Sequence, residues 1–254
     1  MDPTRTAAIG PPGRPVEYLV LVCDLGEHRS PAAHQVVRRA LTPRPARCEE
    51  VPEGLMVTAP VTGMHERRAL AQTVWRALRQ YLPGVAVTVA GGAAWRLRGT
   101  DSAAILQAQQ TLVAGRAIRG PGRVILIDDL GALAFLVGRP VAHLQYFYGG
   151  VLGPLAEIDD ERTEALLETT SLYLRLGCNL ADTARLLSLH RNTVQQRLAR
   201  IATLTGLDPH DPDARLTLQN AILARRLVAL LTGPGHPGLT TTAAPGAGVA
   251  APAA

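Results

Sequence analysis

Amide and arginine side chains gather on one face of the segment that spans residues 191–205. In a helix, which turns by about 100° per residue, they lie opposite the apolar positions Val194, Leu198 and Ile201. Asn and Gln can form paired hydrogen bonds with adenine, and Arg with guanine, at edges that the major groove of DNA exposes. No acidic residue occurs in residues 186–206, so no carboxylate there would repel phosphate. The pattern indicates a helix that reads duplex DNA.

The polar residues of this segment divide into two predicted groups. We expect one group to contact bases: Arg191, Asn192, Gln195 and Gln196. We expect the other group to contact phosphate, which positions a protein without reading sequence: His190, Thr193, Arg197 and Arg200. The start of the helix would enter the groove first, with its free backbone amides facing phosphate. A merely solvated face is the alternative, because all 26 basic residues of the chain are arginine and arginine is therefore its default cation.

A helix that reads DNA needs a second helix to hold it at a steep angle. The sequence predicts a short helix over residues 180–187 and a turn at 188–190 before the reading helix, which is the spacing of a helix-turn-helix. Ala184 supplies the small side chain where two such helices cross, and Asn179 is expected to cap the first of them. Further helices predicted before and after this pair complete an all-α domain over residues 161–231.

The last predicted helix of this domain carries more apolar surface than one neighbour would cover. Its large apolar residues are Leu216, Ile222, Leu223, Leu227, Leu230 and Leu231. One helix-turn-helix reads only about half a turn of groove, so affinity is usually gained by pairing two half-sites. We therefore expect a homodimer and regard this helix as a candidate dimer surface; the alternative is that it simply completes the helical bundle.

The same segment carries a recognisable pattern of residues. The motifs LxxTxxxYL, NxxxTARLLxxHRNTVxxRLxRI and GLDxxDPxxRLxLxxA follow one another within residues 151–223. In this combination the segment resembles the C-terminal domain of the PucR/CdaR class of bacterial transcriptional regulators. The residues that match at the predicted DNA face are His190, Arg191, Asn192, Thr193 and Arg197. The resemblance implies a helix-turn-helix that binds DNA. The class usually has a basic residue and an aromatic where this chain has Gln195 and Gln196, so its operator preference does not carry over.

Upstream, strand-like and helix-like patterns alternate. Strands are expected over residues 16–23, 54–60, 85–90 and 123–128, and helices over 31–41, 64–82 and 101–115, with a short turn of helix over 129–137. Such alternation predicts a sheet covered by helices, here an α/β domain over residues 16–145. The order of these strands and helices, directly before the predicted DNA-binding domain, resembles the degenerate GGDEF-like domain of these regulators. The predicted fold class is therefore α+β with two domains, an α/β domain followed by an all-α one.

The sequence argues against catalysis in that upstream domain. A diguanylate cyclase needs a Gly-Gly-acid-Glu-Phe hairpin and carboxylates that hold metal ions against a triphosphate, whereas residues 48–54 read CEEVPEG. Asp24 and Asp128–Asp129 end strands, where capping is the expected role and cation binding the alternative. Gly91–Gly92 lacks the rest of a phosphate loop, so a tight turn is expected. The aromatic cluster at residues 146–148 is expected in the core or at a domain contact. We predict neither enzymatic activity nor a bound cofactor or metal.

Composition sets the remaining expectations. The net charge of +5 and pI of about 9.6 fit a polyanionic partner such as duplex DNA. Three cysteines without CxxC spacing suggest neither a disulfide framework nor a zinc site, so we expect a cytoplasmic protein. The apolar run at residues 18–23 is too short to span a membrane.

The Pro-, Gly- and Ala-rich ends, residues 1–15 and 232–254, are expected to be disordered, and residues 146–160 to form a packed joint between the domains. Two other functions stay open. One is a nucleotide or small-ligand sensor acting through the α/β domain, and the other is a protein-interaction module that does not bind DNA. A regulator of this kind could also respond to an unidentified small-molecule effector.

Overall fold

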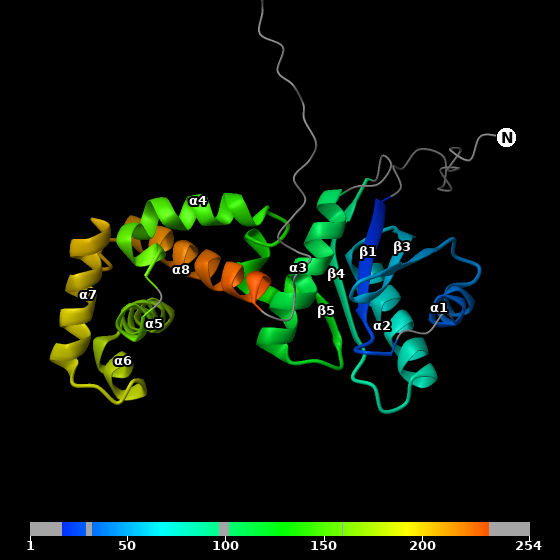
Figure 1. Ribbon diagram of the computed structural model, residues 1–254, viewed down its shortest axis with the longest axis horizontal. Helices are drawn as coiled ribbons and strands as arrows, with labels where there is room; N and C mark the ends of the chain where they lie inside the picture. Colours follow the sequence, from blue (N-terminus) through cyan, green and yellow to red (C-terminus); the bar gives the residue numbers. More distant parts are fainter. Residues whose placement is uncertain (1–16, 29–31, 97–101, 159, 234–254) are drawn as a thin grey trace, which may run out of the picture.

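The computed structural model describes residues 17–28, 32–96, 102–158 and 160–233. An α/β domain and a helical lobe lie at opposite ends of an elongated molecule, joined by two long helices (Figure 1). The fold class predicted from the sequence is confirmed. The expected disordered ends lie outside the described residues, apart from Thr232 and Gly233.

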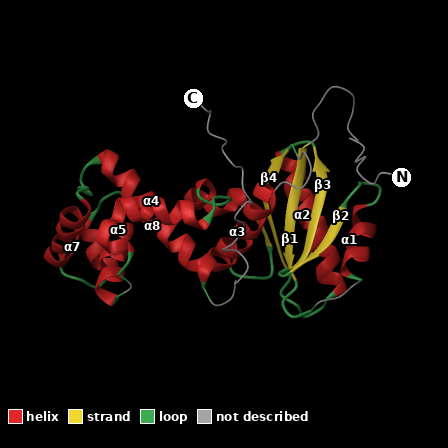
Figure 2. Cartoon of the chain, turned by 45° about the horizontal axis from the view of Figure 1, so that its top comes forward, coloured by secondary structure: helices red, strands yellow, loops and turns green. Residues whose placement is uncertain are grey.

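Five strands form one sheet in the order β2-β3-β1-β4-β5 (Figure 2). They are β1 (Glu17–Asp24), β2 (Arg47–Val51), β3 (Gly54–Val61), β4 (Thr88–Trp95) and β5 (Val124–Leu126). The first four pair antiparallel, and β5 pairs parallel with β4. With helices α1 (Ala33–Leu41) and α2 (Met64–Tyr81) between them, these four strands have the β-α-β-β-α-β order of a split βαβ fold.

Helices cover both faces of the sheet. Successive residues of a strand point to opposite faces, and in β1 Leu19 and Leu21 pack toward α1 and α2, whereas Val20 and Val22 pack toward α3 (Ser102–Arg119). Because both faces are buried, β1 reads as a continuous apolar run and was predicted within one residue.

The two glycines of β4 correct one prediction. Gly91 and Gly92 lie inside the strand instead of forming a tight turn. A Cβ added to Gly91 would lie 2.7 Å from Leu21 Cδ2, and one added to Gly92 would lie 2.6 Å from Gln107 Oε1. Gln107 extends from α3 and accepts a hydrogen bond from the backbone N–H of Ala93 at 2.7 Å. The glycines therefore allow a helix and a neighbouring strand to approach the backbone closely.

The acidic residues at the strand ends are engaged within the chain. Asp24 Oδ1 accepts the backbone N–H of Gly26 at 2.8 Å, and its other oxygen pairs with Arg116. Asp129 Oδ2 accepts the backbone N–H of Leu126 at 2.8 Å, as a cap does. Within the described ranges, no group of three or more His, Cys, Asp or Glu side chains could hold a metal ion.

The sequence did not predict helix α4, which crosses the expected end of the α/β domain at residue 145. After the 3₁₀ segment η1 (Ile127–Phe135), α4 spans Val141–Leu152 and ends in η2 (Gly153–Ala156). Tyr146 was expected in the core or at a domain contact, yet it is 87% exposed. The reason is helical phase, because the buried stripe of α4 passes through Leu144 and Leu152 on another side of the helix.

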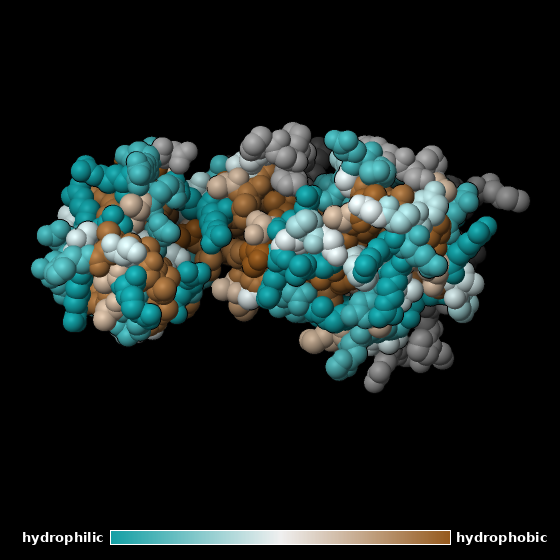
Figure 3. Space-filling view, turned by 90° about the horizontal axis from the view of Figure 1, so that it is seen from below, coloured by the Kyte–Doolittle hydropathy of each residue, from teal (hydrophilic) through white to brown (hydrophobic). Residues whose placement is uncertain are grey.

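Helix α4 packs along α8 (Pro212–Thr232), and this pair, which we call the waist, connects the two ends of the molecule (Figure 1). Leu218 and Ala221 of α8 belong to the core of the helical lobe, whereas Leu227 and Leu231 join a core shared with α3, η1 and α4. Apolar surface gathers at the waist on the face seen in Figure 3. No helix in the described ranges is both long and apolar enough to cross a lipid bilayer.

The apolar residues of α8, the candidate dimer helix, thus pack mainly against other parts of the same chain. Leu227 and Leu231 are fully buried, and Ile222, Leu223 and Leu230 are half-buried. Leu216 is 64% exposed. For most of these residues the structure supports the alternative, that the last helix completes the packing of the chain.

Candidate nucleic-acid interface

Three helices build the candidate interface: α5 (Glu161–Arg175), α6 (Leu180–Leu186) and α7 (Arg191–Thr205). Asn179 caps α6 as predicted, since its Oδ1 accepts the backbone N–H groups of Ala181 and Asp182 at 3.0 and 3.2 Å. The turn after α6 is tight. Ser188 adopts a positive φ of 54°, and the N–H of Leu189 donates to the carbonyl of Ala184 at 2.9 Å. These are the features of a Schellman ending, which reverses the chain within three residues.

Apolar contacts fix α7 against its neighbours. Ala184 of α6 packs in one cluster with Tyr173 of α5 and with Val194 and Leu198 of α7. Ile201, one turn further along α7, is fully buried in the core of the lobe. The predicted small residue at the helix crossing and the predicted apolar anchors therefore lie where the helix-turn-helix requires them.

The opposite face of α7 is open at the far end of the molecule (Figure 1). Every residue expected to contact bases is exposed there: Arg191, Asn192, Gln195 and Gln196. Ala199 and Thr203 are exposed on the same face and were not predicted. They could have been found from the helical period alone, because Ala199 lies two turns beyond Asn192 and Thr203 lies two turns beyond Gln196. An alanine methyl can contact the methyl group of thymine.

The residues expected to contact phosphate differ in their surroundings. His190 is exposed and caps α7, because its Nδ1 accepts the backbone N–H of Asn192 at 3.2 Å. In the neutral ring the proton then lies on Nε2, which is left as a donor. Arg200 is exposed and Thr193 is half-buried. Arg197 is also half-buried, and its Nη1 donates to Thr169 Oγ1 and to the carbonyl of Ala165, both on α5.

A polar groove separates α5 from α7. It is an open depression of about 900 Å³ lined by Asp160, Glu161, Arg162, Ala165, Leu166, Gln196, Arg197 and Arg200. Asp160 caps α5 by accepting the N–H of Thr163 at 2.7 Å, and this hydrogen bond holds the pKa of its carboxyl below the ordinary value. The groove brings Arg162 beside α7. Sequence reasoning did not single out Arg162, because 38 positions separate it from Arg200 along the chain.

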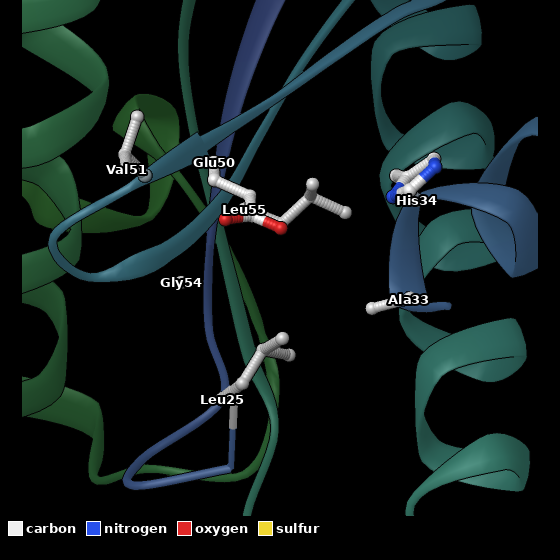
Figure 4. Close-up of a pocket in the computed structure, with 7 residues that line it drawn as sticks. All are labelled: Leu25, Ala33, His34, Glu50, Val51, Gly54 and Leu55. Atoms are coloured by element: carbon white, nitrogen blue, oxygen red, sulfur yellow. The ribbon is translucent and has the colours of Figure 1, made fainter. Parts of the chain in front are cut away.

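The α/β domain offers a much smaller space at the hairpin where the GGDEF signature would be sought. Side chains of α1, of the strand hairpin and of the loop after β1 enclose it (Figure 4). They are Leu25, Ala33, His34, Glu50, Val51, Gly54 and Leu55. Its volume is about 20 Å³, which is room for about one water molecule. Ligand pockets typically enclose about 300 to 1,000 Å³, so this cavity does not accommodate a nucleotide.

Comparison with known proteins agrees with the resemblance found in the sequence. Residues 166–224 match the family model of the PucR C-terminal helix-turn-helix domain. The purine catabolism regulatory protein of Bacillus subtilis is 34% identical over 126 residues, which are 50% of this chain and 24% of that protein. An uncharacterized protein of Mycobacterium tuberculosis is 34% identical over 109 residues, 43% of this chain and 25% of that protein. The chain thus spans about a quarter of the length of these relatives.

Among solved structures, a regulator of polyketide synthase expression from Bifidobacterium adolescentis aligns with a TM-score of 0.41 and 21% identity. The alignment covers 84% of this chain and 86% of that one. The helix-turn-helix described above coincides with the segment matched by the family model. In sequence and in structure, residues 166–224 are thus similar to the PucR C-terminal helix-turn-helix domain.

Proposed function

We propose that this chain is a sequence-specific DNA-binding transcriptional regulator that places α7 in the major groove. One observation carries the proposal: the second helix of a helix-turn-helix has a fully buried apolar face and, opposite it, an exposed face of amides and arginines without a carboxylate. The domain family and the regulatory relative support the same function. A helix of a solvated bundle also has a buried apolar face and an exposed polar one, but it would not require the exposed face to lack carboxylates.

Within this proposal the exposed residues have separate roles. Arg191, Asn192, Gln195 and Gln196 contact base edges. His190, Thr193 and Arg200 contact phosphate and set the register of the helix on the duplex. Two copies of the chain bind two half-sites centred about 34 Å apart, because one helix reads too few base pairs for useful specificity. The operator would then be an inverted repeat.

Selection of bound sequences from a random duplex library tests the proposal. The full chain is compared with a variant in which N192A and Q196A are combined, and with R226A, which removes an exposed arginine of α8 outside the interface. We expect the full chain and R226A to enrich the same inverted repeat and the double variant to lose it. Binding should weaken steeply with salt, because phosphate contacts release counterions.

Other outcomes would contradict the proposal in distinct ways. If a folded protein enriches no sequence and its weak binding to DNA is independent of salt, the helix-turn-helix does not contact phosphate. A role as a protein-interaction module would then be favoured. If a sequence is enriched equally by the double variant, DNA is read by residues other than those of α7.

A further inference from the structure

Arg197 connects α7 to α5 through a small, partly buried network of hydrogen bonds. Its Nη1 lies 2.9 Å from Thr169 Oγ1 and 3.3 Å from the carbonyl oxygen of Ala165, and donates to both. Thr169 is fully buried, and its hydroxyl donates to the same carbonyl of Ala165 at 2.6 Å. The threonine hydroxyl therefore accepts from α7 and donates within α5, so both of its hydrogen-bonding roles are fulfilled.

The position of Arg197 on α7 explains why it turns inward. At about 100° per residue, Arg197 lies one step beyond Gln196, toward the buried stripe of Val194 and Leu198. It is half-buried, whereas Arg191 and Arg200 are exposed. The side chain crosses the α5–α7 groove to reach α5, so this nitrogen of its guanidinium is not directed at the face that meets DNA.

The apolar residues of α7 hold the helix against the lobe by a driving force that is non-directional. A hydrogen bond to a neighbouring helix adds a restraint that depends on direction as well as distance. Groups that bind a partner must be held within about 0.5 Å and 10–20° of their productive geometry. A planar guanidinium bonded to two acceptors on α5 restrains such a rotation.

We propose that Arg197 is a positioning residue: by bonding Thr169 and Ala165 it fixes the rotation of α7 relative to α5, and so aims Asn192 and Gln196 at the bases, without itself neutralising a phosphate. This inference rests on the proposed function for its effect on DNA recognition. The coupling between Arg197 and Thr169, in contrast, exists in the protein alone. The two claims can therefore fail separately.

The chain offers a matched pair of substitutions for the test. T169V keeps the shape of the side chain and removes the hydroxyl that accepts from Arg197. T170V makes the same change at the next position, where Thr170 is also fully buried and donates to its own helix, to the carbonyl of Leu166 at 2.9 Å. Arg197 donates to Thr169 and not to Thr170 in the contacts of the described residues. Only T169V should disturb the arginine.

The first measurement is thermal unfolding of the full chain without DNA, as a double-mutant cycle. We expect T169V to lower the Tm by about 2–4 °C more in the native background than in the R197A background, as for a coupling lost from a domain of this size. T170V should lower the Tm equally in both backgrounds. Additive effects of T169V and R197A would overturn the proposed link between α7 and α5.

The second measurement separates positioning from phosphate contact. Affinity is measured by fluorescence anisotropy for the duplex enriched by selection and for a scrambled duplex. The measurements are made at several salt concentrations, at a temperature at which every variant is folded. We expect T169V and R197K to lower the preference for the enriched duplex at least about tenfold, with the salt dependence unchanged, because the charge is kept or untouched. R200A should make log K fall less steeply with log salt, with the slope reduced in magnitude by about 0.9.

The opposite pattern would overturn the assignment. If R197A lowers the salt slope as R200A does, while T169V keeps the native preference, Arg197 contacts phosphate directly. If T169V lowers the Tm but keeps the preference, the network is merely structural. If the native chain binds neither duplex, the proposed function fails, whereas the unfolding cycle still decides whether the two helices are coupled.

Discussion

At the scale of single residues, the polar side chains at the start of α7 combine a structural role with the binding role that we propose for them. His190 shows this most clearly, because one ring nitrogen caps the helix and the other is left to donate. A cap satisfies a backbone N–H group that the helix cannot pair. In the proposed complex, the residue that stabilises the helix end would therefore also be the first donor that an approaching phosphate meets.

Substitutions at His190 can separate these two roles. H190A should lower the free energy of unfolding by about 1 kcal/mol, because the cap is lost. H190N should keep most of that stability, since asparagine is among the best capping residues. Both should weaken DNA binding, because both lack the ring donor, but should leave its salt slope nearly unchanged, because a neutral donor releases no counterion. Urea denaturation and binding titrations at several salt concentrations measure the two effects. Equal destabilisation by both substitutions would show that the histidine ring is held for another reason.

At the scale of elements, the sequence predicted those whose apolar period and end signals agree. Helices α6 and α7 were predicted almost to the residue, because an Asn cap, a short turn and a regular apolar stripe coincide. Strand β2 was missed, since Glu49 and Glu50 interrupt its apolar pattern at the edge of the sheet. Helix α4 was missed because Gly149 and Gly150 lower its helix propensity.

The candidate site likewise has one part that the sequence could predict and one part that it could not. The exposed face of α7 could be predicted, because it depends on the phase of a single helix. The contact from Arg197 to Thr169 could not, because it joins two helices whose mutual placement is set by the tertiary packing of the lobe. The role of a polar side chain at the edge of a buried stripe therefore depends on the neighbouring helix as well as on its own.

Glycines in two elements should respond in opposite ways to alanine. G149A and G150A should each raise the free energy of unfolding by about 1 kcal/mol, because a Cβ at either position of α4 meets nothing within 4 Å. G91A should lower it by about 1–3 kcal/mol, because its Cβ would lie 2.7 Å from Leu21 Cδ2 inside the sheet. Urea denaturation measures all three. A loss of stability in the α4 variants would indicate that another group approaches that helix closely.

At the scale of the whole molecule, α8 is a single helix that belongs to two cores. Its first half packs in the helical lobe and its second half packs beside α3, η1 and α4. Both tryptophans of the chain lie in the α/β domain and none lies in the helical lobe: Trp75 is on α2 and Trp95 is on β4. Their fluorescence therefore reports the unfolding of that domain alone, which makes coupling through the waist measurable.

A substitution in the helical lobe should consequently lower the stability of the α/β domain as well. Leu218 is fully buried in the lobe, so L218A should cost about 2–5 kcal/mol through the cavity that it leaves. If α8 couples the two cores, the midpoint of the tryptophan transition in urea falls together with the midpoint followed by circular dichroism. L216A, two residues away on the same helix and exposed, should shift neither midpoint.

An unchanged tryptophan midpoint in L218A, with a separate earlier transition in circular dichroism, would show that the lobe unfolds on its own. The waist would then be a passive connection between a DNA reader and an independent α/β domain. Coincident transitions would mean instead that a change in the stability of the α/β domain also alters the lobe that holds α7. In that case an effector that binds the α/β domain could alter DNA binding without contacting the reading helix, because it would change the equilibrium that both cores share.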